Sequence, residues 1–178
     1  VYVETGTTPN CTDETSFVVT INPSPTADAP INVTACDGYV LPALSAGNGY
    51  FTTTGGVGPI VAGTNITTTQ TIFIYAETGT LPNCSDENSF TVTINTTPLA
   101  DAPGNEIKCD TYELPALTNG NYFTGAGGTG TPLFAGNNIT NAGVNTIYVY
   151  TPAVAPCVAA ENSFTVTINT TPLADAPG

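Results

Sequence analysis

The sequence ENSFTVTIN appears at residues 87–95 and again, letter for letter, at residues 161–169. In the first copy Phe90, Val92 and Ile94 alternate with serine and threonine. Alternation with a period of two is typical of a β-strand that buries one face and exposes the other. The pattern predicts a half-buried strand at each copy.

The whole chain repeats around this strand. A variant, ETSFVVTIN, occupies residues 14–22, and TTPLADAPG occurs at both 96–104 and 170–178. These shifts of 73 to 74 residues predict a repeat of about 73 residues, which is the signature of a tandem array. This repeat divides the chain into four predicted parts: the C-terminal part of a repeat at 1–26, complete repeats at 27–99 and 100–173, and the start of another at 174–178. We therefore expect the chain to be a segment of a longer array.

The fold class follows from the strand signals. Helical apolar periodicity is absent, whereas residues 71–77 (TIFIYAE) and 146–151 (TIYVYT) read as strands that are covered on both faces. Shorter candidate strands lie at 31–36, 39–44, 50–52 and 59–62. Six or seven short strands in each repeat predict an all-β protein built of tandem small immunoglobulin-like β-sandwiches.

Five cysteines divide the chain regularly, at 11, 36, 84, 109 and 157, with gaps of 25, 48, 25 and 48. Each complete repeat therefore contains two cysteines, which favours disulfides within repeats, Cys36–Cys84 and Cys109–Cys157, with Cys11 left over. Pairing across the seams, Cys11–Cys36 and Cys84–Cys109, is the alternative, since sequence alone does not fix connectivity. Either scheme implies an oxidising, extracytoplasmic setting.

Composition excludes several classes of function. The chain has 178 residues, 14 acidic side chains, one basic side chain and no histidine, for a net charge of −13. One lysine cannot neutralise a phosphate backbone, so no nucleic-acid partner is expected. No apolar run approaches the roughly 20 residues that span a bilayer, so no membrane insertion of this segment is expected.

Acidic side chains recur in equivalent loops of successive repeats. Asp28 and Asp101 lie in the seams, and Asp86 and Glu87 follow a cysteine. Calcium prefers such oxygen ligands, so these four are weak candidates for a calcium site between repeats. Solvated acidic loops are the simpler interpretation, and no other cofactor is expected. Recurrence in surface loops also argues against a catalytic carboxylate pair, so we expect no enzyme activity.

Two tyrosines recur beside glycine-rich loops. Tyr50 and Tyr122 each precede a phenylalanine, in GYFTTTGG and NYFTGAGG. Exposed aromatic rings of this kind could stack on sugars, although packing in a core is the commoner role of a repeated aromatic. They are the weak candidates for ligand binding in this chain.

The recurring motifs CDxYxLPAL, NYFTGxGG, AGxxIT, TIYVY, CxxENSFTVTI and TPxADAP resemble the tandem immunoglobulin-like repeats of Bacteroidota surface proteins exported by the type IX secretion system, including SprB-like gliding adhesins. The resemblance covers nearly the whole chain. The segment PAVAPCVAAEN departs from it where ETGTLPNCSDEN is expected. The resemblance implies an extracellular, cell-surface stalk with a role in adhesion or gliding motility, and it carries no catalytic residue.

These observations favour a structural and adhesive stalk segment whose partners are further copies of the repeat, and in addition surface glycans or other copies of the chain. Two alternatives remain open. One is a carbohydrate-binding accessory region of a secreted enzyme, and the other is a self-assembling extracellular filament.

Overall fold

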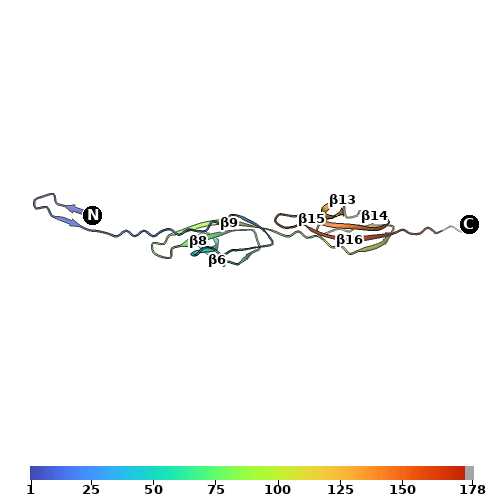
Figure 1. Cartoon of the computed structure of the whole chain (residues 1–178), viewed down its shortest axis with the longest axis horizontal. Helices are drawn as coiled ribbons and strands as arrows, with labels where there is room; N and C mark the ends of the chain where they lie inside the picture. Colours follow the sequence, from blue (N-terminus) through green and yellow to red (C-terminus); the bar gives the residue numbers. More distant parts are fainter. Residues whose placement is uncertain (175–178) are drawn as a thin grey trace.

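The computed structural model describes residues 1–174, and its regular structure is β apart from one short 3-10 turn. Two domains lie end to end along an extended chain, and a small N-terminal hairpin lies beyond one of them (Figure 1). Each domain corresponds to one complete sequence repeat. The tandem β-sandwich architecture predicted from the repeat is therefore confirmed.

The first domain has a five-stranded sheet in the order β3-β9-β8-β5-β6 and a two-stranded sheet of β4 and β7. Strand β3 pairs parallel to β9, whereas all the other pairs are antiparallel. Its strands are β3 (Val33–Cys36), β4 (Tyr39–Val40), β5 (Asn48–Thr53), β6 (Val57–Ile60), β7 (Asn65–Ile66), β8 (Gln70–Glu77) and β9 (Ser85–Asn95).

The second domain repeats this topology, with sheets β10-β16-β15-β12-β13 and β11-β14. It differs by the 3-10 turn η1 (Ala126–Gly128) between β12 and β13. Its strands are β10 (Glu106–Cys109), β11 (Tyr112–Glu113), β12 (Asn121–Gly125), β13 (Thr129–Leu133), β14 (Asn138–Ile139), β15 (Gly143–Thr151) and β16 (Ala160–Asn169).

The core of each domain lies between the large sheet and the small one. In the first domain Phe90 and Val92 of β9 are 2% and 0% exposed. They belong to one apolar cluster with Ile72 of β8, Leu41 and Ile66. Equivalent side chains, among them Leu114, Ile139, Phe164 and Val166, form the core of the second domain. The alternation read from ENSFTVTIN therefore does place one face of each strand in a core.

The outer face of the large sheet is covered only in part. Phe73 and Tyr75 of β8 are half-buried, so the prediction that residues 71–77 are covered on both faces is wrong. Tyr75 packs edge-on against Phe51, with ring centroids 6.0 Å apart. A Cβ atom at Gly56 would lie 2.9 Å from the Tyr75 ring, so only glycine lets the β5–β6 turn approach it so closely. Aromatic packing, rather than a second layer, explains the apolar residues on this face.

The N-terminal hairpin is equivalent to the tip of the β-hairpin that β8 and β9 form in the first domain. Its strands are β1 (Tyr2–Glu4) and β2 (Thr12–Glu14). The amide N–H of Thr5 donates to the Cys11 carbonyl at 3.0 Å, as that of Thr78 does to Cys84, also at 3.0 Å. Residues 1–14 therefore repeat local structure as well as sequence, whereas residues 15–26, whose sequence matches β9 and the linker, form no strand.

Residue boundaries at 27, 100 and 174 come from the sequence repeat and stay predictions. The segment assigned to the start of a further repeat, 174–178, lies outside the described residues except for its first position. In residues 1–174 there is no helix with the length and apolarity needed to cross a membrane.

Candidate functional site at the junction of the repeats

A disulfide joins the two domains. Cys36, the last residue of β3, is bonded to Cys157 in the β15–β16 connection, with their Cα atoms 5.2 Å apart. The bond closes a sequence separation of 121 residues. Both predicted pairs within repeats, Cys36–Cys84 and Cys109–Cys157, are therefore wrong. The alternative across the seams is wrong as well, because Cys11, Cys84 and Cys109 are free in the described structure.

The direction of β3 explains this result. Because β3 runs parallel to β9, Cys36 lies opposite Asn95, where β9 ends, whereas Cys84 directly precedes Ser85, where β9 begins. A strand of 11 residues spans about 33 Å at roughly 3.3 Å per residue. Disulfide geometry requires Cα atoms within about 7 Å, so the two cysteines of one repeat cannot meet. They lie at opposite ends of the domain, where each faces a neighbouring repeat.

The linker after β9 is held by Asp37. The Thr97 amide N–H donates to Asp37 Oδ1 at 2.8 Å, and the Thr97 hydroxyl donates to Asp37 Oδ2. The Asp37 amide N–H in turn donates to the Asn95 carbonyl at 2.8 Å. Asp37 adopts a left-handed φ of 61°, a conformation that aspartate tolerates better than most residues. The turn after Cys36 thus fixes the start of the linker.

These hydrogen bonds stabilise the ionised Asp37. The Thr97 hydroxyl, and then its amide, lower the pKa of Asp37 below its ordinary value of 3.8. The same arrangement recurs at the far end of the second domain. Thr171 donates its amide to Asp110 Oδ1 at 2.8 Å and its hydroxyl to Asp110 Oδ2 at 2.6 Å, and these bonds lower the pKa of Asp110. Each domain therefore ends in a clasp between an aspartate and a threonine.

Hydrogen bonds from the second domain hold the other end of the linker. The Thr151 hydroxyl donates to the Leu99 carbonyl at 2.6 Å, and Asn162 Nδ2 donates to the Ala100 carbonyl at 2.8 Å. A direct contact also crosses the junction, where Asn95 Nδ2 donates to the Ala155 carbonyl at 2.7 Å. The two domains are thus joined by two covalent connections, the short peptide and the disulfide. Two connections at different points oppose both bending and twisting.

The four carboxylates that sequence reasoning offered to calcium bind backbone amides instead. They accept hydrogen bonds from Ser45 to Asp28 (2.8 Å), from Ala27 to Asp86 (2.8 Å), from Gly55 to Glu87 (2.6 Å) and from Thr118 to Asp101 (2.5 Å). The Thr118 amide, together with Asn119, lowers the pKa of Asp101. In residues 1–174 no three acidic or cysteine side chains converge on a point that could hold a metal ion.

The two candidate ligand-binding tyrosines lie in the cores. Tyr50 and Tyr122 are each 2% exposed and pack against Phe90 and Phe164, with ring centroids 6.3 and 6.1 Å apart. Burial raises the pKa of both phenols. Neither ring presents a face to a sugar, so the interpretation as stacking platforms is wrong. The recurrence of these tyrosines reflects packing.

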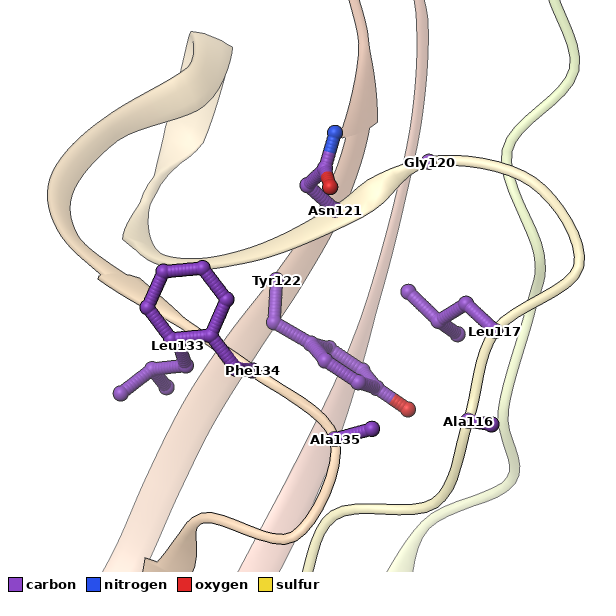
Figure 2. A pocket seen from close by; sticks show the side chains of 8 residues that line it. All are labelled: Ala116, Leu117, Gly120, Asn121, Tyr122, Leu133, Phe134 and Ala135. Atoms are coloured by element: carbon purple, nitrogen blue, oxygen red, sulfur yellow. The ribbon is translucent and has the colours of Figure 1, made fainter.

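A hollow does adjoin each tyrosine. In the second domain it measures about 200 Å³ and lies between the loop of Leu117 and the segment Leu133–Ala135, beside the Tyr122 ring (Figure 2). An equivalent hollow of about 360 Å³ in the first domain is lined by Leu44 and Ile60. No charged side chain lines either hollow. Both linings mix apolar side chains with a few polar ones, Asn121 in the second domain and Ser45 and Asn48 in the first.

Comparison with known proteins adds little to these findings. No family model and no curated protein matches the sequence. Among solved structures, the chain is similar to the crystal structure of human mucin-like protocadherin EC1-2, at 9% identity and a TM-score of 0.26. That match covers 82% of this chain and 98% of the other.

Sequence reasoning missed Asp37, Thr97 and their equivalents Asp110 and Thr171. A signal was present, because each aspartate directly follows the first cysteine of its repeat and each threonine lies two residues beyond the strand ending in TIN. The parallel pairing of the first and last strands, which brings these positions together, could not be read from the pattern.

Proposed function

We propose that this chain is a non-enzymatic spacer of an extracellular stalk, in which successive β-sandwich repeats hold a more distant part of the parent protein away from a cell surface. The observation that carries the proposal is the disulfide between Cys36 of one repeat and Cys157 of the next. A bond within a domain stabilises that domain, whereas a bond between domains fixes their relative orientation.

The linker supports the same proposal. Four residues, 96–99, separate β9 from the point where Asn162 binds Ala100, and the clasp of Asp37 and Thr97 holds one end of them. Domains joined by such a short, pinned peptide have little freedom to fold back on one another. Rigidity along the array is the property that a spacer needs.

Disulfide chemistry and charge are consistent with an extracellular position. Disulfides persist in oxidising compartments and are rare in the cytosol. The net charge of −13 spreads along the length of the chain and keeps neighbouring stalks apart at low salt. Adhesion and gliding motility, which the resemblance to type IX-exported repeats implies, would be exerted by regions that the stalk displays.

Immunogold electron microscopy of unpermeabilised cells that produce the parent protein tests this function, with antibodies raised against the chain. The proposal predicts gold particles outside the cell and displaced from the membrane. Labelling that requires permeabilisation would refute the extracellular stalk, and gold lying directly on the membrane would refute the spacer role.

A further inference from the structure

The bond between Cys36 and Cys157 leaves three cysteines free in the described chain, and each of the three is equivalent to a bonded one. Cys109 is the counterpart of Cys36, because each ends the first strand of its domain. Cys11 and Cys84 are counterparts of Cys157, in the connection before the last strand of a repeat. Equivalent positions in a repeat have equivalent neighbours when the array continues.

We infer that Cys84 and Cys109 form disulfides with further copies of this repeat, so that each junction of the array carries its own bond. The partner of Cys84 is the first cysteine of the preceding repeat, and the partner of Cys109 is the second cysteine of the following one. The inference deepens the proposed stalk function and rests on it.

Contacts at Cys84 reproduce those at the bonded Cys157. Asn22 Nδ2 donates to the Pro82 carbonyl at 3.2 Å, as Asn95 Nδ2 donates to the Ala155 carbonyl at 2.7 Å. The sulfur atoms also lie alike: Sγ of Cys84 is 3.9 Å from the Asn22 carbonyl oxygen, and Sγ of Cys157 is 3.4 Å from that of Asn95. The hairpin that carries Cys84 therefore already docks on Asn22, the residue equivalent to Asn95 at the end of β9.

The surroundings of Cys109 reproduce those of the bonded Cys36. Asp110 has a φ of 62°, against 61° for Asp37, and its clasp with Thr171 repeats the clasp with Thr97. The amides of both aspartates donate to the last residue of the final strand at 2.8 Å. Cys109 is also exposed, as a thiol that awaits a partner must be. The surroundings of both cysteines of a bonded junction are thus reproduced, those of Cys157 at Cys84 and those of Cys36 at Cys109.

Formation of each bond requires an oxidant, which is a disulfide compound such as oxidised glutathione. The thiolate of one cysteine attacks the oxidant, forms a mixed disulfide and releases one glutathione thiol. The thiolate of the second cysteine then attacks the mixed disulfide and releases the other. Two protein thiols are oxidised to one disulfide, and one glutathione disulfide is reduced to two thiols.

Successive bonds would interlock. Because Cys109 lies between Cys36 and Cys157 in sequence, the loop closed by its bond overlaps the loop closed by theirs. Under tension the shortest covalent path runs from Cys157 forward along 25 residues to the first cysteine of the next repeat, and from there across its disulfide to the second cysteine of the repeat after that. A fully oxidised array can therefore extend by only about 25 residues for every two repeats, instead of about 146.

The test uses the whole chain with one more copy of residues 100–173 fused after Leu173. Because residues 170–178 repeat residues 96–104 letter for letter, this fusion continues the natural sequence. The added copy carries Ile107→Val and Val158→Ile, at positions that are 71% and 73% exposed, so that its peptides differ in mass. After oxidation with glutathione disulfide and cleavage after Asp and Glu, the linked peptides are identified by mass spectrometry.

The inference predicts that Cys109 of the original repeat is linked to the tagged second cysteine of the added copy, and that three of the seven cysteines remain free thiols. Five free thiols, a bond within the added copy, or a bond between separate chains would each overturn it. The matched Cys109→Ser variant should leave the tagged cysteine free while keeping Cys36 bonded to Cys157. Neither result depends on immunogold labelling, so failure of the proposed disulfides between repeats can be distinguished from failure of the proposed stalk function.

Discussion

Reduction of the disulfide between Cys36 and Cys157 should lengthen the chain greatly when it is pulled from its two ends. In the oxidised protein the force passes from Cys36 directly to Cys157, so the 121 residue steps between them bear no load. At about 3.5 Å per residue, these steps hide about 420 Å of contour length. The oxidised chain should therefore reach full extension about 420 Å before the reduced chain.

Single-molecule force spectroscopy measures this difference, and Cys36→Ser should give the longer length with or without reductant. Cys109→Ser is the matched control, because it removes a cysteine of the equivalent strand and should leave the difference unchanged. Two bonds within repeats would hide two loops of 48 residues, about 340 Å in total, and Cys109→Ser would then halve the value. Either that pattern or equal lengths in both redox states would refute the reasoning.

Three further results are expected. Phe90→Ala and Phe164→Ala should each lower the free energy of unfolding of their domain by about 3–5 kcal/mol, whereas the equivalent Phe17→Ala, at a position 76% exposed, should change it little. Denaturant unfolding measures all three variants, and equal effects would contradict the assigned cores. Reduction should lower the stability of the pair of domains by up to about 5 kcal/mol in the chain-entropy model, seen as a lower denaturant midpoint; an unchanged midpoint would show that the bond does not couple them. The pKa of Asp37 is lowered in the folded protein, so the stability that its clasp adds is present above the ordinary pKa of 3.8 and is lost as the pH falls through the folded pKa. The amide chemical shift of Thr97, followed by NMR, should therefore titrate with a midpoint below 3.8. A midpoint at or above 3.8 would count against the clasp.

Much of the fold could be predicted from the sequence because the relevant information is local. The alternation of Phe90, Val92 and Ile94 fixes which face of one strand is buried, and its recurrence fixes the repeat. Side-chain burial on β8 was harder to predict from the sequence. Ile72 and Ile74 enter the core, whereas Phe73 and Tyr75 pack on the outer face, where the β5–β6 turn at Gly56 lies against the Tyr75 ring. An apolar run does not reveal whether its second face meets another layer or its own neighbours.

The disulfide could not be predicted because it depends on how one domain is placed on the next. The regular gaps assign two cysteines to each repeat, and this equal division suggested bonds within repeats. Because β3 pairs parallel to β9, Cys36 lies at the end of the domain opposite to Cys84. Likewise, the recurrence of Tyr50 and Tyr122 identified important residues without showing that both are buried.

The most direct test of the disulfide between repeats is peptide mapping of the oxidised 178-residue chain with its free thiols blocked. Cleavage after Asp and Glu places each cysteine on its own peptide, with Cys36 in residues 29–37, Cys84 in residues 78–86 and Cys157 in residues 114–161. The account predicts a cross-link between 29–37 and 114–161, with three blocked thiols. A cross-link between 29–37 and 78–86 would contradict it.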